Sequence, residues 1–427
     1  MPQRRISRGL NNMFEKFQCR SCNSPNGELI LDLGEQPLAN NLLPADAPAG
    51  VEAAFPLRLA ACTECWLLQI TDLVPPKDLF TDYVYFSSTS AAWVRHAAEC
   101  ATRYRSEFAL DESSFVVEIA SNDGYLLRNF AAAGIPHLGI EPAGNIATVA
   151  RDAGVETQVD FFSQSLATDL AANRAADLLL ANNVFAHAPD TNDFVAGLKA
   201  LLAPEGWAVL EFPHALEMVR LGEFDTIYHE HVFYFTVTAL APLFARHGLR
   251  IVRVERTPMH GGSLRVFARH DGFEADEMVA ELLAEESAVG VGGLDLYRAF
   301  ADKALRTQEE LTENVAALKR DGKSLAAYGA AAKGSTLLNF CGLTAEDIAF
   351  VVDRSPHKVG RLMPGSRVPI VDADELARRA PDVALLLAWN FAEEIIAQQT
   401  GYVESGGQFL VPVPEVRLLG KSAKVEA

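Results

Sequence analysis

Four of the six cysteines form two CxxC pairs, and no other feature constrains the N-terminal part of this chain as strongly. The first pair opens a turn-rich segment and the second closes it, with residues 23–61 between them. Two such pairs converge on one tetrahedral zinc ion, and four thiolates leave no coordination position for water or substrate. A segment with so little apolar core also gains folding energy from a metal. We therefore predict a structural Zn2+ on Cys19, Cys22, Cys62 and Cys65, the alternative being four unrelated buried thiols.

Charge and cysteine content narrow the class of protein. The 427 residues carry a net charge of −19, a field that repels nucleic acid. The sequence has no apolar run of about eighteen residues, so we predict no membrane span. The basic N-terminus is not followed by the apolar stretch of a signal peptide. Few cysteines in a large acidic chain are typical of a reducing cytosol. We expect a cytoplasmic protein without nucleic-acid or membrane partners, either a monomer or a weak homo-oligomer.

From Phe115 onward the chain alternates short apolar runs with helical stretches. The runs FVVEIA, HLGIEP, DLLLANNV and WAVLEFP have the spacing of strands in a doubly wound parallel sheet. A charged helical stretch follows, and the same alternation then returns. We predict an α/β protein with a zinc-binding domain over 15–76, a central doubly wound domain over 77–273, linking helices over 274–320 and a C-terminal Rossmann-like domain over 321–415.

The loop after the first run, residues 120–124, precedes a helix whose N-terminus offers N–H groups. It lacks the glycine-rich cradle of a dinucleotide site. Glu118, Asp123 and Glu141 suit a cationic, ribose-bearing cofactor, with Glu141 placed to accept ribose hydroxyls. The pattern favours S-adenosylmethionine (SAM), the alternative being that Glu118 and Asp123 only cap the helix. The residues that we assign to SAM are Glu118, Ala120, Asn122, Asp123, Gly124, Glu141, Pro142, Phe161, Asn182 and Asn183.

Two further polar clusters follow strands of the central domain. Asn182, Asn183 and His187 lie after the third run, at the carboxyl edge where α/β sheets bind ligands. The segment YHEH, residues 228–231, follows the fourth run among aromatic residues. Histidine titrates near neutral pH, so either cluster supplies a candidate general base, with structural histidines as the alternative. The HEH spacing differs from the zinc-binding HExxH motif, so we predict no second metal.

In combination, these motifs resemble those of the SAM-dependent C-methyltransferases that act at C-3 of nucleotide-linked 4-keto-6-deoxy sugars. The resemblance extends from residue 19 to about residue 412 and includes the CxxC pairs, EIASNDG, GIEP, ANNVFAH, YHEHVFYF, HGGSLR and YGAAAKG. The family has an N-terminal zinc-binding domain, a central class I SAM-methyltransferase domain and a C-terminal Rossmann-like domain. One departure is Ala120, where the family usually has glycine.

The resemblance implies a mechanism. A base removes the C-3 hydrogen, which the C-4 ketone acidifies, and the resulting carbanion attacks the methyl group of SAM. The family motif Tyr-x-Glu-His supplies the base and matches Tyr228, Glu230 and His231, with His231 as base and Glu230 as its partner. His187 and Tyr228 would lie near the ketone oxygen or sugar hydroxyls. A family tyrosine corresponds to Tyr85 or to Tyr83, which we assign to catalysis and to substrate binding respectively.

The C-terminal domain carries a second turn from strand to helix. Gly329 to Gly334 joins the run KSLAAYG to a helix N-terminus, and Lys333 in this turn suits the diphosphate of a TDP- or GDP-linked sugar. Asp353 ends the next strand, either to bind a ribose or to cap. The alternative is a structural repeat that packs on the central domain. The residues that we assign to the substrate are Tyr83, His260, Gly329, Lys333 and Gly334. His260 lies in a glycine turn, and the alternative for this turn is a plain hairpin without a substrate contact.

Three other functions remain alternatives at this stage. The chain is a SAM methyltransferase acting on a non-sugar C–H or hydroxyl group, an NAD-dependent oxidoreductase that uses the C-terminal domain, or a non-catalytic zinc-ribbon binding module. Under the leading hypothesis, we interpret the zinc as a clamp that fixes the loop of Tyr83 and Tyr85 over the sugar pocket, without a part in the chemistry.

Overall fold

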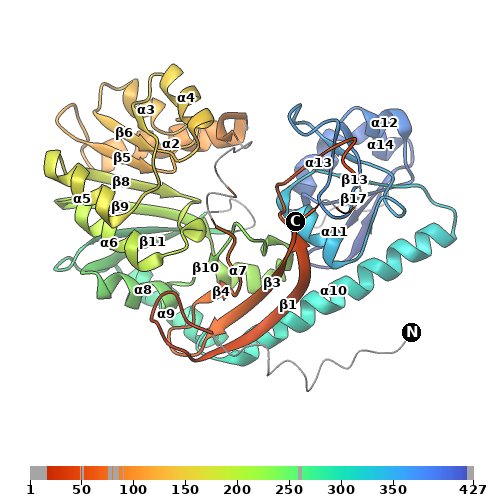
Figure 1. Cartoon of the computed structure of the whole chain (residues 1–427), viewed down its shortest axis with the longest axis horizontal. Helices are drawn as coiled ribbons and strands as arrows, with labels where there is room; N and C mark the ends of the chain where they lie inside the picture. Colours follow the sequence, from red (N-terminus) through yellow and green to blue (C-terminus); the bar gives the residue numbers. More distant parts are fainter. Residues whose placement is uncertain are drawn as a thin grey trace.

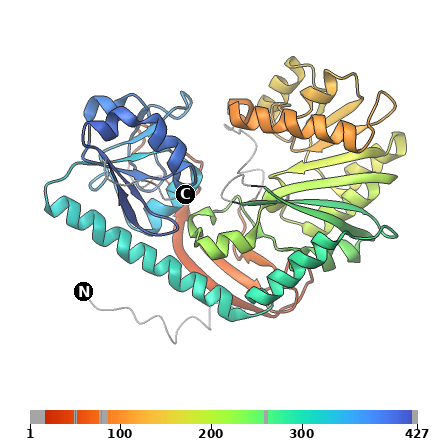
Figure 2. The same ribbon diagram turned by 180° about the vertical axis from the view of Figure 1, so that it is seen from behind.

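The computed structural model describes residues 17–48, 50, 52–75, 79, 86–89, 91–257 and 262–420. The predictions for Tyr83, Tyr85 and His260 therefore lie outside the described residues. Two α/β lobes stand at the ends of a shared base, which consists of two long N-terminal strands and one long helix (Figures 1 and 2). No helix within the described ranges combines the length and the apolar character that crossing a membrane requires.

The N-terminal sheet has the order β1-β3-β4-β10 and is antiparallel. Its first three strands follow one another closely in sequence, whereas β10 comes from the YHEHVFYF segment of the central region. Residues Phe233 and Tyr234 of β10 pair with Gln69 and Leu68 of β4. The strands of this region are β1 (Gly27–Pro37), β2 (Leu43–Pro44), β3 (Ala54–Cys62), β4 (Leu68–Ile70) and β10 (Phe233–Tyr234).

The central sheet has seven strands in the order β11-β12-β9-β8-β5-β6-β7. Five adjacent strands run parallel, and the hairpin of β11 and β12 closes one side, with β12 antiparallel to β9. The inner strands are buried apolar runs, as expected for a sheet covered on both faces. The strands are β5 (Val116–Ile119), β6 (His137–Ile140), β7 (Thr157–Gln158), β8 (Ala176–Asn182), β9 (Leu202–Pro213), β11 (Leu249–Thr257) and β12 (Ser263–His270).

Alternate residues of β8 pack against opposite layers of helices. Leu178 and Leu180 belong to the core under α2, α3 and α4, whereas Leu179 and Ala181 belong to the core under α5, α6 and α8 (Figure 1). The helices of this lobe are α2 (Ala91–Glu107), α3 (Arg128–Ala131), α4 (Gly144–Asp152), α5 (Gln164–Asn173), α6 (Thr191–Leu201), α7 (Ala215–Leu221) and α8 (Val237–Arg246), with short 3-10 turns η2 (Ser87–Thr89), η3 (Phe185–His187) and η4 (Phe224–Thr226).

The predicted linking stretch forms two helices, α9 (Glu277–Val289) and α10 (Leu294–Arg320), and α10 runs along the base toward the second lobe (Figure 2). That lobe has a sheet of order β16-β14-β13-β17-β18-β19, parallel except for β19. Its elements are β13 (Leu325–Tyr328), α11 (Ala332–Phe340), β14 (Val351–Asp353), β15 (Arg361–Leu362), β16 (Ile370–Asp372), α12 (Glu375–Arg379), β17 (Val383–Leu386), η6 (Trp389–Phe391), α13 (Ala392–Gln398), α14 (Thr400–Glu404), β18 (Gln408–Val411) and β19 (Arg417–Leu419).

The two lobes and the N-terminal region meet through buried side chains and one short strand pair. The indole N–H of Trp389 donates to Asp225 Oδ2 at 2.6 Å, and the rings of Phe224 and Phe340 lie 5.3 Å apart. β15 of the C-terminal lobe pairs with β2 of the N-terminal region. The contacts place the carboxyl edges of the two parallel sheets around a common space.

Candidate active site

A cavity of about 860 Å³ lies where the three regions meet. Seven of the residues that the sequence assigns to SAM line it, as do four predicted catalytic residues and Lys333. Its polar lining includes Asn40 of the N-terminal region, Asn122, Glu141, Asn182, Asn183, His187, Tyr228, Glu230 and His231 of the central lobe, and Lys333, Lys358 and Asn390 of the C-terminal lobe. The roles of these residues stay predictions, but the fold brings them to one place.

Three carboxylates cluster at the loop after β5. Burial raises the pKa of Glu118 well above its usual value, and the neighbouring charges of Asp123 and Glu141 raise it further. Within the described ranges, Glu118 Oε2, Asp123 Oδ1 and Asn182 Oδ1 are buried and have no hydrogen-bond partner. Glu118 and Asp123 lie behind the cavity lining rather than in it. Concentrated negative charge with unsatisfied acceptors suits a cationic ligand such as SAM, so the residues present fit this cofactor.

The loop itself has an unusual backbone. Ala120, Asn122 and Gly124 all have positive φ angles, of 53°, 50° and 75°. Glycine is required at position 124 because a Cβ there would also lie 2.8 Å from Val155 Cγ2. Ala120 has a left-handed backbone conformation, which costs an alanine roughly 1–2 kcal/mol of strain and costs a glycine nothing. This strain is the physical consequence of the departure from glycine at this position.

Glu141 follows β6 and is fixed by two backbone N–H groups. Its Oε2 accepts from Asn122 N at 3.0 Å and its Oε1 accepts from Ala143 N at 2.9 Å. Each carboxylate oxygen has a further lone pair, so both remain able to accept a hydroxyl donor. The geometry suits the predicted contact with a ribose. Burial raises the pKa of Glu141, and the two N–H donors oppose that rise.

His231 lies between two hydrogen-bond partners. Its Nδ1 lies 3.0 Å from the carbonyl oxygen of Thr226, which can only accept, so Nδ1 carries the proton. Its Nε2 lies 2.8 Å from the hydroxyl of Tyr228 and is the acceptor in the neutral ring. The tautomer thus leaves the basic nitrogen on the Tyr228 side.

Glu230 is buried beside this pair but does not orient the imidazole. Among the described residues, its carboxyl group has one hydrogen bond, from Asn40 Nδ2 to Oε1 at 2.6 Å. Both ring nitrogens of His231 face other groups, so the expected direct bond between Glu230 and His231 is absent and the Thr226 carbonyl takes that orienting position. Burial raises the pKa of Glu230 to about 7, and Asn40 opposes this shift.

His187 is also buried, and its ring packs edge-on against His231 with 4.9 Å between centroids. Its Nδ1 donates to the carbonyl oxygen of Glu230 at 2.7 Å. Burial lowers the pKa of His187 to about 4, so the ring is neutral at neutral pH and its Nε2 is an acceptor. A neutral acceptor here suits a hydroxyl group of a ligand better than a developing oxyanion.

The turn from β13 into α11 brings a cation, Lys333, to the cavity instead of acids. Gly329 has φ of +90° and a Cβ there would meet Ala388 Cβ at 2.8 Å, while a Cβ on Gly334 would meet Leu387 Cβ at 2.7 Å. Both glycines therefore serve the turn and the close packing of α11 on the sheet. Lys333 Nζ donates to Asn390 Oδ1 at 2.7 Å and lies 4.2 Å from the centre of the Trp389 ring. Desolvation lowers the pKa of Lys333, and the carboxylates of Asp225 and Glu223 oppose that shift.

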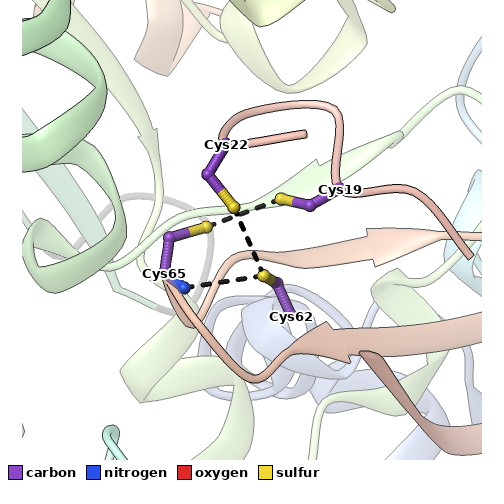
Figure 3. A group of neighbouring side chains, drawn as sticks. All are labelled: Cys19, Cys22, Cys62 and Cys65. Atoms are coloured by element: carbon purple, nitrogen blue, oxygen red, sulfur yellow. Dashed lines mark hydrogen bonds between the residues drawn. The ribbon is translucent and has the colours of Figure 1, made fainter. Parts of the chain in front are cut away.

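The four predicted zinc ligands converge from two turns (Figure 3). Their Sγ atoms all lie within 4.8 Å of one another, with 3.5 Å between Cys19 and Cys65 and 3.6 Å between Cys22 and Cys62. A tetrahedral ion with Zn–S bonds of about 2.3 Å separates its sulfurs by roughly 3.8 Å. The cluster therefore fits a structural Zn2+.

The zinc-binding turns also support the catalytic segment. Arg20 donates to the carbonyl oxygens of Ile70 and Thr71 at 2.6 and 2.9 Å, which fixes the end of β4. Ile70 N in turn donates to Val232 O at 3.0 Å, next to His231. The zinc region therefore contacts the YHEHVFYF segment, and it also contacts α6 through Thr191 and Asn192 and α8 through Arg246. The interpretation that it clamps the Tyr83 and Tyr85 loop falls outside the described residues.

Several cavity residues were not identified from the sequence, among them Asn40, Lys358, Asn390 and the carbonyl group of Thr226. Asn40 and Lys358 lie in loops and Thr226 ends η4, all without a motif, and of these only Asn40, within a turn-forming LANN segment, has a weak local signal. Lys358 Nζ donates to Ala330 O at 2.7 Å and lies 3.7 Å from Asp353 Oδ2. It adds a second cation to the Lys333 side of the cavity.

Comparison with known proteins agrees with this arrangement. Residues 19–80 match the family model described as "Putative zinc binding domain", residues 93–254 match "Methyltransferase domain", and residues 258–414 match "C-methyltransferase C-terminal domain". The C-methyltransferase NovU of Streptomyces niveus is 39% identical over 405 residues, which cover 94% of this chain and 96% of NovU.

The solved structures below each cover less than half of this chain. Magnesium protoporphyrin IX methyltransferase of Synechocystis, with bound SAM, is 13% identical, covers 44% of this chain and 86% of that chain, and has a TM-score of 0.34. The CcbJ methyltransferase of Streptomyces caelestis is 14% identical, covers 41% and 89%, and has a TM-score of 0.33.

The fold and the domain matches define a SAM-dependent methyltransferase with a zinc-binding N-terminal region. Because it is 39% identical to NovU over 94% of its length, the chain belongs to the C-methyltransferase family. The predictions of fold class, of SAM as cofactor and of the four-cysteine zinc site are confirmed, and the alternatives of an oxidoreductase and a non-catalytic module are not supported. When bound, SAM supplies an electrophilic methyl group.

Proposed function

We propose that this enzyme methylates C-3 of a TDP- or GDP-linked 4-keto-6-deoxy sugar, as a step in deoxysugar biosynthesis. The observation that carries the proposal is the composition of the 860 Å³ cavity described above. It combines an acid-rich cofactor loop, a histidine–tyrosine–glutamate cluster and two lysines on a separate lobe. A keto-sugar bound between the cofactor loop and the histidine–tyrosine–glutamate cluster, with its diphosphate toward the lysines, would contact all three groups.

His231 is the proposed base. Its Nδ1–H bond to the Thr226 carbonyl leaves Nε2 to accept the C-3 proton, since the C-4 ketone makes that hydrogen acidic. When Nε2 takes the proton, the Tyr228 hydroxyl 2.8 Å away is released to donate to the oxygen that becomes negative at C-4. The electron pair of the former C–H bond would then form the C–C bond to the methyl group that SAM supplies, the electron pair of the broken S–CH3 bond would leave with the resulting thioether, and His231 would return its proton to solvent.

Glu230 and His187 complete the proposed sugar site. An ionised Glu230 would stabilise the imidazolium of His231 through space rather than through a hydrogen bond, because its carboxylate is held by Asn40. Neutral His187 would accept a hydrogen bond from a sugar hydroxyl. Lys333 and Lys358 would neutralise the diphosphate at the N-terminus of α11.

The test is mass spectrometry of the products formed from SAM and a panel of TDP- and GDP-linked 4-keto-6-deoxy sugars. A net gain of CH2 on one nucleotide sugar, together with exchange of its C-3 hydrogen for deuterium in D2O before methyl transfer, is the expected result. Methylation that persists after the nucleoside diphosphate is removed would favour a non-sugar or free-sugar acceptor. No methylation of any member of the panel would overturn the proposal.

A further inference from the structure

Asn40 connects the zinc-binding region to the catalytic cluster. It lies in the turn between β1 and β2, where Asn41 N donates to Leu38 O at 3.0 Å and Leu42 N donates to Asn40 O at 2.9 Å. This turn fixes its backbone and directs its side chain to Glu230, 190 residues further along the chain, with Nδ2 to Oε1 at 2.6 Å. Both residues line the cavity.

Glu230 depends on this one donor. Its exposed fraction is 5%, and in the described part of the chain the Asn40 amide is the polar partner of its carboxyl group and no cation accompanies it. The titratable neighbours are His229 and His231 on its own segment and His187 from η3. The printed contact of His187 with Glu230 is to its backbone carbonyl, and the described bonds of His229 and His231 go to backbone carbonyls and to Tyr228 rather than to the Glu230 carboxyl group. A buried carboxylate without a cation is costly, and the Asn40 amide is what offsets that cost.

The backbone on either side of Glu230 is held as well. Val232 O accepts from Ile70 N at 3.0 Å on the zinc-binding side, and Val232 N donates to Ala186 O at 2.8 Å on the central side. With β10 paired to β4, the main chain stays in place whether or not position 40 carries an amide. Substitution of Asn40 should therefore affect the Glu230 carboxyl group more than the fold.

We propose that Asn40 is a positioning residue of the active site, because its amide holds the Glu230 carboxylate at the cavity in its ionised form. The zinc-binding region then contributes a side chain to catalysis in addition to stabilising the fold. The inference rests on the proposed function for the role of Glu230, but the contact and its effect on ionisation do not depend on the substrate.

The variants are Asn40→Ala, which removes the donor, Asn40→Asp, which replaces it with a like charge, and Asn40→Gln, which keeps an amide. Asn41→Ala, at an exposed position of the same turn, is the matched control. Each is made in the full chain. Zinc content, thermal unfolding, Kd for SAM and the pH profiles of kcat and kcat/KM are measured on all of them.

For Asn40→Ala we expect kcat at neutral pH to fall about 10-fold or more, because the lost bond is to a charged group. Without its donor Glu230 holds its proton more tightly, so the acidic limb of the profile moves to higher pH and activity partly returns as pH rises. Asn40→Asp should shift the limb further, Asn40→Gln should shift it less, and Asn41→Ala should match the wild type. An unshifted limb in Asn40→Ala, or a loss of activity that follows zinc content or unfolding, would overturn the proposal.

A second measurement does not need turnover. Infrared difference spectra across a pH titration contain the protonated carboxyl band of Glu230, identified by its loss in Glu230→Gln. The midpoint should rise in Asn40→Ala and stay in place in Asn41→Ala. If no nucleotide sugar is methylated but the midpoint rises, the proposed function fails and the role of Asn40 stands. A midpoint that does not move overturns the role of Asn40 whatever the substrate.

Discussion

The two Rossmann-like units of this enzyme hold the acid after their second strand in the same way. In the central unit, Glu141 accepts from Asn122 N in the loop after the first strand and from Ala143 N two residues onward. In the C-terminal unit, Asp353 accepts at 2.8 Å from Ala330 N in the corresponding loop and at 2.8 Å from Ser355 N two residues onward. The same backbone geometry thus recurs on two sheets with different sequences.

The units differ in the charge around that shared geometry. Glu118, Asp123 and Glu141 cluster around the central loop, and the charges of the other two raise the pKa of Glu118. The C-terminal loop is apolar, and Lys333 and Lys358 lie on its side of the cavity. One scaffold therefore suits a cationic cofactor in the first unit and an anionic group in the second. The difference teaches that side-chain charge, rather than the fold, assigns the ligand to each unit.

The largest expected effect is on kcat, because the proposed base, His231, belongs to the central unit. His231→Asn should lower kcat about 10³-fold through loss of the base and leave Kd for SAM unchanged, because the ring does not belong to the cofactor loop. Rates of methyl transfer and of C-3 deuterium exchange measure this, with His137→Asn at the start of β6 as control. Exchange at the wild-type rate in His231→Asn would assign the base elsewhere.

A matched pair of substitutions tests the shared acid directly. Glu141→Gln should weaken SAM binding about 10- to 100-fold, since an NH2 group would face one of the two backbone N–H donors and a charged acceptor is lost. Asp353→Asn makes the same change in the C-terminal unit and should leave SAM binding intact while raising KM for the nucleotide sugar. Titration calorimetry with SAM separates the two variants. Equal weakening of SAM binding by both would remove the distinction between the units.

Lys358→Ala tests the anionic ligand of the C-terminal unit. We expect KM for the nucleotide sugar to rise about 10-fold with kcat and SAM binding nearly unchanged, because Lys358 lines the cavity from the C-terminal lobe, whereas the cofactor loop and His231 belong to the central lobe. The effect should shrink at high salt, where the charge is screened. Lys323→Ala, an exposed ion-paired lysine of the same lobe, is the control. Lys358 is a better target than Lys333, whose removal leaves Asp225 and Glu223 buried without a cation.

The smallest expected effect concerns the contact between the two units, where Glu223 and Asp225 of the central unit lie near Lys333 of the C-terminal unit. Burial raises the pKa of Glu223 to about 8, although Lys333 lowers it in part. The folded pKa exceeds the unfolded value of about 4.3, so proton binding stabilises the folded state at low pH and this contribution is lost as pH rises toward 8. Glu223→Gln should therefore be more stable than wild type by about 1 kcal/mol near pH 9, with a smaller difference near pH 5.

Thermal unfolding from pH 5 to pH 9 checks the expectation for Glu223. The exposed Glu274→Gln variant should differ from wild type by the same small amount at every pH. A stability difference for Glu223→Gln that does not grow with pH would mean that Glu223 is ionised and satisfied in the folded protein.

Short-range patterns made much of this molecule predictable. The CxxC spacing predicted the zinc cluster, because a knuckle is a local structure and needs only the two pairs to meet. Buried runs predicted the strands of both sheets, and parallel sheets place their loops at one edge, so the SAM loop, Asn182 and His187 were expected near one another. The domain boundaries and the roles of Tyr83, Tyr85 and His260 stay predictions.

Only the tertiary structure decided which distant groups meet at the cavity. β10 joins the sheet of the zinc-binding region, Asn40 reaches Glu230, and the Thr226 carbonyl rather than Glu230 orients His231. Nothing in the local sequence fixes such contacts, because a carboxylate or an imidazole accepts any donor of suitable geometry. Which donor binds each of these groups depends on how the whole chain packs around its core. The sequence by itself therefore determined many of the residues that belong to this site, and only the tertiary structure decided which of them pair.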